Sequence, residues 1–392
     1  MRPLSPETRL VFRSADPACG AGEAAALARE AREWGRVMLM AEREMAVAPL
    51  WRLLERGGTA AVPEDVAAYL ARSAMVSDFR MRHLSARLAE TLRAFAAQDV
   101  EVLLLKGAAV GAMSDATFRA RPMRDLDLLV RPQDRARARA ALASAGWAQT
   151  TDPVLHDLLR EQHHEPPFLD ARMPDVRVEL HHALFPGDHS FAFGESDLWR
   201  DAVAAEGPFA AARRPSAEHL LLHGCIHFGW QHMMQFGPWR TFRLVAVAAA
   251  APGFSWERFT AQARAARAAT VCYWTLRLAQ RLSALPVPAP TLAALAPPTW
   301  PAARDAIERH FITGLAAGEG APSPSVAVTR WLWRAAIRPG WSGHERAARW
   351  DPEAKWARAL GTASTESAGA RLRRHLADHR RWWRFVTNVL RG

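Results

Sequence analysis

The stretch LLLKGAAVGAMSDATFRARPMRDLDLLV, residues 103–130, joins an apolar run, a Lys-Gly step and an Asp-x-Asp motif. VEVLLLKG is a short apolar run rich in strand-forming residues that ends at glycine, which predicts a buried strand. AAVGAMSDATF is predicted to be a helix leaving this glycine, RARPMR is an arginine-rich loop, and DLDLLV alternates as a second strand. Lysines and arginines together number 51, yet the only lysines are Lys106 and Lys355. Because lysine is so rare in this chain, the lysine directly before Gly107 is a candidate functional residue.

Three further segments extend this unit. PQDRARARAALASAG, residues 132–146, is predicted to be a helix that Pro132 opens and Gly146 closes, and a short helix is predicted near 153–163. VRVELHHALF, residues 176–185, alternates as a half-buried strand. Its polar face is predicted to carry Arg177, Glu179 and His181.

Helical patterns flank this unit on both sides. Residues 22–98 are predicted to be helical, with an apolar face that includes Leu70, Met75, Leu84, Leu88, Leu92 and Phe95. The chain is predicted to be helical again from Pro215 onward, and the Pro-rich segment 285–301 is the predicted boundary or linker. The expected division is an N-terminal helical region (1–95), an α/β core (96–205), a helical domain (206–290) and a basic, Trp/Arg-rich helical C-terminal region (300–392).

Length and composition indicate a globular protein of two or three domains, since 49% of the 392 residues are hydrophobic and 23% are charged. The cysteines Cys19, Cys225 and Cys272 are too few and too scattered for a disulfide framework or a cysteine-based zinc site. The N-terminal residues lack the apolar core of a signal peptide, and the most apolar run, from Leu244, is too short to span a bilayer. These features predict a cytoplasmic protein.

The positive charge is unevenly distributed. The formal net charge is +11, but residues 330–392 hold 14 basic and five acidic side chains, which leaves 37 and 35 for the first 329 residues. A nearly neutral body argues against nucleic acid as the main partner, although the basic tail keeps it open.

Two carboxylates are expected on one face of the second strand. Asp125 and Asp127 are two residues apart, so their backbones lie about 6–7 Å apart on the same face, and like charges there raise each other's pKa unless a cation neutralises them. Glu179 offers a third carboxylate on a second strand. Oxygen ligands of this kind suit Mg²⁺ or Mn²⁺ and in-line phosphoryl chemistry. A strand that ends in aspartates at an exposed sheet edge explains the motif alone equally well.

The basic residues of the same stretch favour a phosphate-binding site over an exposed sheet edge. A glycine that opens a helix after a buried strand presents backbone N–H groups to a phosphate. Lys106 can add a point charge, and Arg119, Arg121 and Arg124 can clamp phosphate oxygens.

These segments together resemble a known family. LLLKGAAV, RARPMRDLDLLV, ALASAGW and VRVELHHALF are similar to the uncharacterised bacterial nucleotidyltransferases of the DNA-polymerase-β-like superfamily, from about Leu103 to Phe185. The resemblance implies an α+β fold: a small polymerase-β-like core, with a mixed sheet and helices, between N-terminal and C-terminal helical regions. It also implies that Gly107 has the role of the glycine motif, and that Asp125, Asp127 and Glu179 are the catalytic, metal-binding acids.

The implied reaction moves a nucleoside monophosphate from a nucleoside triphosphate (NTP) to an acceptor hydroxyl and releases pyrophosphate. Residues expected to contact the nucleotide are Lys106, Gly107, Arg121, Arg124 and His181. The acceptor is left open among a small molecule, a sugar, a peptide and a protein. Two positions depart from the superfamily: Ala108 follows Gly107 in place of serine or glycine, and WRTFRLVAVAAA lacks the aspartate that relatives often carry.

Two other features have competing interpretations. His223 and His227 are four residues apart on a predicted helix, but a third zinc ligand is missing, so histidines that line the substrate groove are the favoured interpretation. RWLWRAAIRPGW and RRWWRFVTNVLRG mix arginine with tryptophan, which suits a membrane surface or nucleic acid, or else a packed amphipathic helical region.

Two rival functions therefore remain. One is a catalytically inactive binding or assembly module on the same fold, associated with a membrane through its basic tail. The other is an RNA-modifying nucleotidyltransferase, which the charge of the tail favours and the near-neutral body does not.

Overall fold

A mixed sheet is the centre of the region that the sequence predicts to be α/β. The protein is described by a computed structural model that covers residues 3–113, 117–118, 120–150, 163–173, 175–185, 189–317 and 326–337. Within these ranges the sheet has seven strands in the order β3-β4-β5-β2-β1-β7-β6. The strands are β1 (Leu103–Leu104), β2 (Asp125–Leu129), β3 (Trp147–Gln149), β4 (Phe168–Asp170), β5 (Arg177–His181), β6 (Val203–Ala204) and β7 (Arg213–Arg214).

The two longest strands, β2 and β5, pair in parallel, and together with β1 they confirm the three strands that the sequence predicts. In their register Asp127 lies opposite Glu179, and Asp125 lies opposite Arg177. Leu126 on β2 points to the other face and is fully buried. The alternation of the pleat therefore gathers the acidic side chains on one face and the leucines on the other.

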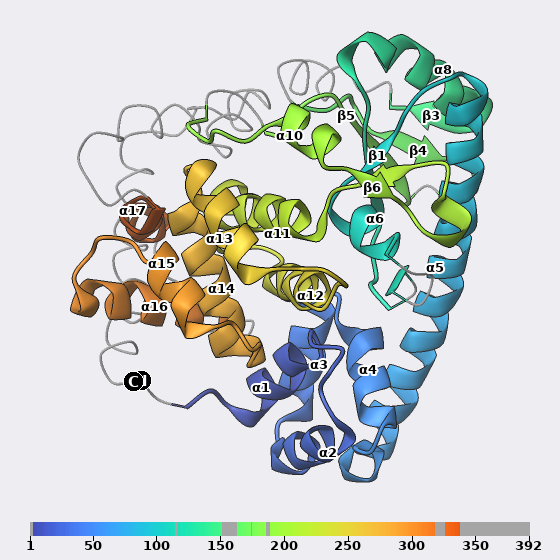
Figure 1. Ribbon diagram of the computed structural model, residues 1–392. Helices are drawn as coiled ribbons and strands as arrows, with labels where there is room; N and C mark the ends of the chain where they lie inside the picture. Colours follow the sequence, from blue (N-terminus) through green and yellow to red (C-terminus); the bar gives the residue numbers. More distant parts are fainter. Residues whose placement is uncertain are drawn as a thin grey trace, which may run out of the picture.

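Helices cover the sheet and account for most of the chain (Figure 1). Before the sheet lie α1 (Pro6–Arg13), α2 (Ala21–Glu30), α3 (Trp34–Arg43), α4 (Val47–Glu55) and α5 (Glu64–Ala97). Between or beside the strands lie α6 (Lys106–Gly111), α8 (Arg135–Ser144) and α10 (Glu195–Arg200). After the sheet lie α11 (Ala217–Ile226), α12 (Pro238–Ala249), α13 (Trp256–Ala265), α14 (Ala269–Ser283), α15 (Ala289–Leu295), α16 (Pro301–Ala316) and α17 (Val326–Ile337). The α+β class with helical flanks is confirmed.

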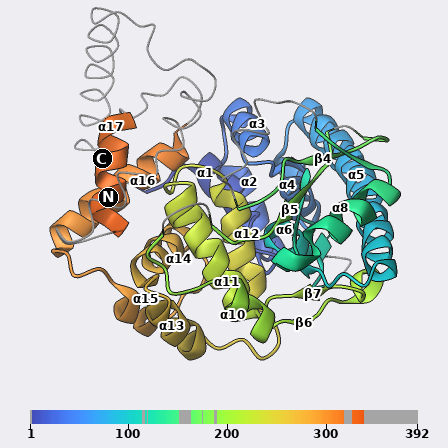
Figure 2. The same cartoon turned by 90° about the horizontal axis from the view of Figure 1, so that it is seen from above.

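The long helix α5 runs along the outer side of the sheet region, from α4 at one end to α8 at the other (Figures 1 and 2). Leu84, Leu88 and Phe95 of the predicted apolar face are buried in the core. Met75 is an exception, because it is 68% exposed. Residues of α4, among them Trp51 and Arg52, lie beside Met75 without covering it, so that the expectation of one continuous buried face is wrong there.

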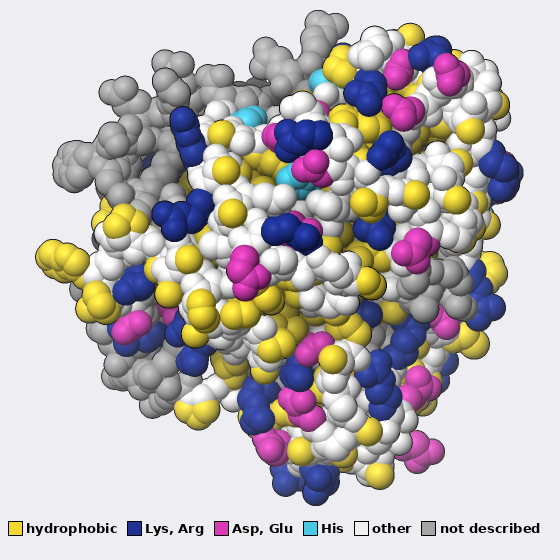
Figure 3. All heavy atoms as spheres, in the orientation of Figure 1, with side chains coloured by type: hydrophobic (Ala, Val, Ile, Leu, Met, Phe, Trp, Pro, Cys, Tyr) yellow, Lys and Arg dark blue, Asp and Glu magenta, His cyan; other side chains and the backbone are white. Residues whose placement is uncertain are grey.

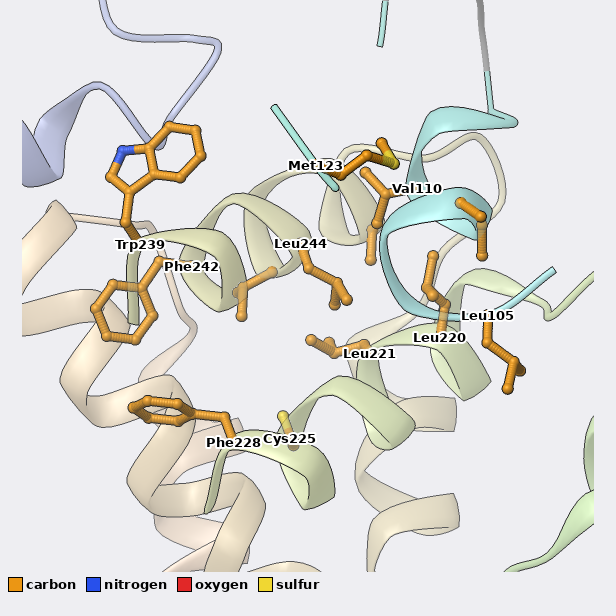
Figure 4. Packing of buried hydrophobic residues seen from close by; sticks show 14 of the residues in the cluster. Leu105, Val110, Met123, Leu220, Leu221, Cys225, Phe228, Trp239, Phe242 and Leu244 are labelled. Carbon is orange, nitrogen blue, oxygen red and sulfur yellow. The ribbon is translucent and has the colours of Figure 1, made fainter. Parts of the chain in front are cut away.

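Helix α6 connects the sheet to the helices that follow it. Figure 4 shows Leu105, Val110 and Met123 facing Leu220 and Leu221 of α11 and Leu244 of α12. All six side chains are buried in one hydrophobic cluster. Burial of apolar surface here fixes the start of α6 against α11 and α12.

The N-terminal helices are joined to α12 by buried polar contacts. Trp239 donates its backbone N–H to Glu44 (3.3 Å) and its indole N–H to the Ser14 hydroxyl (2.9 Å). Glu44 thereby satisfies one of the free N–H groups at the start of α12. The N-terminal region thus supports the helix that borders the cavity described below.

Several sequence expectations on secondary structure need correction. The helical stretch 22–98 is divided into α2, α3, α4 and α5, and α6 begins at Lys106, before the glycine. Strands β3, β4, β6 and β7 were not predicted, because segments of two or three residues are too short to reveal a period. The Pro-rich segment 285–301 contains α15, whose Leu292 and Leu295 are buried. The helix expected near 153–163 lies almost wholly outside the described residues, and so does most of the tail.

Parts of the C-terminal region can be described. Trp333 of α17 is buried and donates its indole N–H to the carbonyl of Gly229 (2.7 Å), as the packed-helix interpretation predicts. Trp331 is 66% exposed. The other tryptophans of the tail, and its arginines apart from Arg330 and Arg334 of α17, lie outside the described residues, so the membrane and nucleic-acid roles of the tail stay predictions. Among the described helices, none has both the length and the apolar character that crossing a bilayer requires.

A buried ion pair anchors α5 to the sheet. The Arg87 guanidinium donates to Asp170 of β4 (2.9 Å) and to the carbonyl of Ala145 (2.8 Å), and it lies over the ring of Trp147. Arg87 is 2% exposed. Replacing Arg87 with Met should lower the free energy of unfolding by about 3–5 kcal/mol, because the buried Asp170 loses its guanidinium partner and keeps only the His83 ring and the Arg172 N–H.

Urea denaturation measures this loss. Arg93→Met is the control, since Arg93 is exposed on the same helix, and it should change the free energy of unfolding by no more than about 0.5 kcal/mol. Equal, small effects of the two substitutions would contradict the anchoring role of Arg87.

Candidate active site

A cavity of about 430 Å³ lies between the polar face of the sheet and the α11–α12 helices. Its size is in the range of small-molecule sites. Residues from several separate parts of the chain line it: Lys106 and Gly107 at the start of α6; Arg121; Asp125, Asp127, Arg177 and Glu179 on β2 and β5; His163 and His164; and Gly224, His227, Gln231, His232, Gly237, Arg240, Thr241 and Leu244 from the α11–α12 region.

The acidic residues lie at the floor of this cavity. Asp127 is 2% exposed, and it faces Glu179 across the β2–β5 pair. Asp125 lines the same cavity one pleat away, with its carboxylate 3.9 Å from the guanidinium of Arg177. Arg177 also approaches Glu179, at 3.4 Å. The structure thus brings Asp127 and Glu179 together and leaves Asp125 closer to the solvent.

Asp127 is held by two hydrogen bonds to a single oxygen. Its Oδ1 accepts from the Lys106 ammonium (2.8 Å) and from Nε2 of His181 (2.9 Å). His181 is fully buried and does not line the cavity, and burial lowers its pKa to about 4. A neutral imidazole that faces a carboxylate donates from that nitrogen, so His181 carries its proton on Nε2. His181 therefore orients Asp127 from below and does not touch the cavity contents.

The backbone at Lys106 is unusual. Its φ of +43° lies in the left-handed region, which a residue with a side chain occupies only at a cost in free energy. The preceding residue, Leu105, donates its N–H to the carbonyl of Asp127 (2.9 Å), and its own carbonyl accepts from Ala109 N–H in α6. The turn from β1 into α6 is therefore fixed to β2, and it directs the Lys106 side chain at the Asp127 carboxylate.

The acids have opposite pKa shifts. Burial alone would raise the pKa of Asp127, but the Lys106 charge and the His181 hydrogen bond hold it well below its usual value. Burial and the negative charge of Asp127 raise the pKa of Glu179 to about 7. The site thus holds one carboxylate that is firmly ionised beside a second one that resists ionisation.

Arg121 is the most exceptional cation of the site. It is 7% exposed, and its Nε has no hydrogen-bond partner among the described residues. Burial, together with the nearby charge of Arg240, lowers its pKa to about 10. Its Nη1 lies so close to Gly107 that a Cβ at residue 107 would be 2.2 Å away. Gly107 is therefore required for the guanidinium to reach the wall of the cavity.

The other predicted phosphate-binding arginines do not behave in the same way. Arg124 is exposed and does not line the cavity, although its carbonyl accepts a hydrogen bond from the Arg177 N–H (3.0 Å). Arg119 lies outside the described residues. Of the two loop arginines that the structure describes, Arg121 is thus the one that lies at the cavity wall.

The opposite wall has a distorted backbone. A π-helical turn, His227–Gln231, follows α11, and the next residues include Met233 and Met234, both with positive φ. π-Helical turns and left-handed residues often occur at functional sites. Here the distortion places His227, Gln231 and His232 on the cavity wall.

The protonation state of His232 follows from its contacts. Its Nδ1 lies 3.0 Å from the carbonyl of Phe236, so Nδ1 donates and Nε2 is left with a lone pair. Burial lowers the pKa of His232 to about 4, and the pKa of His227 lies well below its usual value for the same reason. At neutral pH this wall is polar but uncharged, apart from Arg240.

The sequence anticipated this wall only in part. His227 lines the cavity as the groove-lining interpretation predicts, whereas His223 is buried behind it. Arg240, Gln231 and His232 were missed, because no local pattern links them to the Lys-Gly and Asp-x-Asp motifs about 100 residues earlier. The signal that could have found Arg240 is Gly237-Pro238 just before it, which marks the start of a helix.

The donor atoms of the site suit a divalent cation. One group of three potential ligands is found in the described part of the chain, and it consists of Asp127, Glu179 and His181, whose ligand atoms lie within 4.8 Å of one another. The group contains neither His223 nor His227. Because His181 donates its Nε2 proton to Asp127, the carboxylate oxygens are the donors available to a metal. Two close carboxylates, one with a raised pKa, fit a hard divalent cation.

The family comparison agrees with this chemistry. Residues 30–284 match the model of a family described as "Uncharacterised nucleotidyltransferase". The chain belongs to this nucleotidyltransferase family. The match includes every residue that lines the cavity, as well as most of the N-terminal helices. No curated protein and no solved structure matches the chain.

The pKa of Glu179 predicts how the stability of this nucleotidyltransferase depends on pH. A raised carboxyl pKa means that the folded state holds its proton more tightly than the unfolded chain does, between the usual value of 4.5 and about 7. The contribution of this proton to the free energy of unfolding is complete below pH 4.5 and is lost as the pH rises through 7. In Glu179→Gln the free energy of unfolding should not show this decrease, which is about 2–3 kcal/mol in the wild type.

Urea denaturation of both proteins in EDTA, from about pH 5 to pH 8, measures the effect. The difference between the wild type and Glu179→Gln isolates Glu179 from other titrating groups. Glu101→Gln, an exposed substitution, should follow the wild type. Parallel pH profiles for the wild type and Glu179→Gln would show that Glu179 titrates normally.

Proposed function

We propose that the protein transfers a nucleoside monophosphate from an NTP to a hydroxyl group of an acceptor. A bond forms between the acceptor oxygen and the α-phosphorus, the bond between the α-phosphorus and the bridging oxygen breaks, and pyrophosphate leaves. The acceptor hydroxyl loses its proton in this step. The observation that carries the proposal is the pairing of Asp127 with Glu179 in one cavity with the buried Arg121, whose Nε has no hydrogen-bond partner among the described residues.

The acids would hold Mg²⁺ or Mn²⁺. Asp127 and Glu179 would provide the nearest carboxylate oxygens, and Asp125, on the same face of β2, would complete the set that the sequence predicts. When bound, such an ion supplies neutralisation of the phosphate charge and alignment of the reacting oxygens. Glu179 would also serve as the general base that takes the proton from the acceptor hydroxyl, because its pKa of about 7 is close to neutral pH.

The cations would bind the triphosphate. Arg121 and Lys106 flank Gly107, and Arg240 faces them from α12. Burial of the Arg121 guanidinium is costly, and a phosphate that accepts its N–H groups would offset that cost. His181 acts behind Asp127 in this proposal, as a positioning residue. Arg124 has no role in it, because its side chain does not line the cavity.

The helical wall would hold the uncharged part of the ligands. His227, Gln231 and His232 present hydrogen-bonding groups without formal charge, which suits a nucleobase, a ribose or an acceptor hydroxyl. The Gln231 Oε1 and His163 Nδ1 atoms are buried and have no hydrogen-bond partner among the described residues. Such atoms call for a partner from a ligand or water.

The rival functions receive less support. A buried acidic pair and a buried arginine such as Arg121 are costly to keep in a module that only binds another protein. On the face in Figure 3, basic and acidic side chains of the described residues are interspersed, and no broad basic surface for RNA is visible there. A cytoplasmic location fits an NTP substrate and remains part of the proposal.

An incorporation assay tests the proposed reaction. The protein is incubated with each labelled NTP and Mg²⁺ or Mn²⁺, and pyrophosphate release and self-labelling are measured. Asp127→Asn and Glu179→Gln should each lower the rate at least about a hundredfold, because the charges that oppose the developing phosphate charge are lost. Glu101→Gln, which changes an exposed carboxylate outside the cavity, should retain the wild-type rate. Label transfer that survives Asp127→Asn would refute the assignment of the acids.

Gly107 offers a separate test of the triphosphate site. In Gly107→Ala the new Cβ would occupy the position of the Arg121 guanidinium, which must then move away from the cavity wall. The affinity for a non-hydrolysable NTP analogue should fall about tenfold, the usual effect of one lost charged hydrogen bond. Isothermal titration calorimetry measures it. Gly22→Ala is the matched control, because its Cβ would contact nothing within 4 Å, and unchanged affinity of Gly107→Ala would contradict the role of Arg121.

A further inference from the structure

Lys106 has two possible partners within one cavity. Its ammonium now contacts Asp127, the residue proposed to hold the metal, and it lies beside Gly107 and Arg121, the residues proposed to hold phosphate. We propose that Lys106 keeps Asp127 from a divalent ion until a phosphate accepts the ammonium, so that metal and nucleotide bind cooperatively. This inference rests on the proposed function and specifies how its two ligands depend on each other.

The hydrogen bonds of Asp127 make this competition necessary at Oδ1. A carboxylate oxygen has two lone pairs, and those of Oδ1 are directed at Lys106 Nζ and His181 Nε2. A metal ion at this oxygen requires one of the two donors to leave. His181 is fully buried among the rings of His163 and His164, whereas the Lys106 side chain reaches the open cavity. Lys106 is therefore the donor that can leave.

The same dependence holds if a metal ion binds the other oxygen of Asp127. Lys106 Nζ would then remain within a few ångströms of the ion, and positive charges at this distance repel each other strongly at a site that is mostly shielded from water. The carboxylates of Asp125 and Glu179 would offset this repulsion only in part, because Arg177 contacts both of them and already neutralises part of their charge. At either position of the ion, Lys106 therefore disfavours metal binding as long as no phosphate is bound.

A bound phosphate removes this unfavourable effect of Lys106 on metal binding, because the ammonium then contacts the phosphate. An ammonium group forms strong charge-assisted hydrogen bonds with phosphate oxygens, and its three N–H donors rotate freely on a flexible stem. The backbone does not need to move, because Leu105 N–H stays bonded to the carbonyl of Asp127 and α6 stays packed on α11 and α12. A change in the side-chain torsions of Lys106 is sufficient to exchange the carboxylate for a phosphate.

The expected result is a crossover between two affinities. For Mn²⁺ alone, Lys106→Met should bind at least about tenfold more tightly than the wild type, because a competing positive charge is gone. For the complex of Mn²⁺ with tripolyphosphate, Lys106→Met should bind at least about tenfold more weakly, because the ammonium–phosphate contact is gone. Misfolding would weaken both affinities and cannot produce this crossover.

Two measurements and two further variants complete the experiment. The affinity for Mn²⁺ alone is measured from the free-Mn²⁺ signal in electron paramagnetic resonance, and the affinity for Mn²⁺–tripolyphosphate is measured by calorimetry. Lys106→Arg retains the positive charge and should bind Mn²⁺ alone no more tightly than the wild type. Lys106→Gln, with circular dichroism on every variant, replaces Lys106→Met if the latter fails to fold.

The outcomes separate this inference from the proposed function. If Mn²⁺ binding depends on Asp127, tested with Asp127→Asn, but Lys106→Met binds Mn²⁺ alone no more tightly than the wild type, the competition is refuted and the metal site stands. If neither the wild type nor Lys106→Met binds Mn²⁺ better than Asp127→Asn does, the metal site itself is refuted and the inference falls with it.

Discussion

The parallel pairing of β2 and β5 places two carboxylates side by side in a partly buried position, and much of the surrounding structure compensates for that placement. Asp127 and Glu179 are direct neighbours in the register. Two like charges at such a site are tolerated only if cations or protons reduce them. The chain supplies a lysine and a neutral histidine for Asp127, and it raises the pKa of Glu179 so that this group keeps its proton more readily. The charges of the two carboxylates are thus only partly neutralised by the chain itself, and an additional cation in the cavity would be attracted to them.

The helices on both sides of the sheet hold the cationic half of the cavity in place. Leu105 and Val110 pack against α11 and α12, so the start of α6 cannot shift relative to Arg240 without disturbing a buried apolar cluster. Glu44, from the N-terminal region, binds the first turn of α12 through the Trp239 N–H. Arg240 follows directly after Trp239. The N-terminal helices therefore influence the cavity although none of their side chains lines it, which agrees with a family match that begins at residue 30.

The sequence predicted what depends on local periodicity. Alternation along β2 and β5 was enough to place Asp127 and Glu179 on polar faces, and the Lys-Gly step was enough to predict a turn into a helix. Their contact depends on which strands pair and in what register, and that is decided by non-local packing. Arg121 and Arg124 are equivalent as residue types, and burial of Arg121 against Gly107 distinguishes them. Arg240 and His232 reach the cavity through the packing of α6 on α12, more than 100 residues away in the chain. His181, which was expected beside the ligand, lies behind Asp127 because the end of β5 is covered by His163 and His164.

The exchange proposed for Lys106 also explains why this position holds a lysine in a chain that otherwise uses arginine almost throughout. A guanidinium is planar and matches a carboxylate with two parallel hydrogen bonds, so an arginine at this position would hold Asp127 in a fixed geometry that a metal could displace only with difficulty. An ammonium is a compact point charge that makes a single hydrogen bond to Oδ1 at 2.8 Å, and a second anion can take over that bond by rotation of the side chain. The site thus needs a cation that neutralises Asp127 well enough to bury it and weakly enough to release it, and of the two basic residue types lysine meets both requirements.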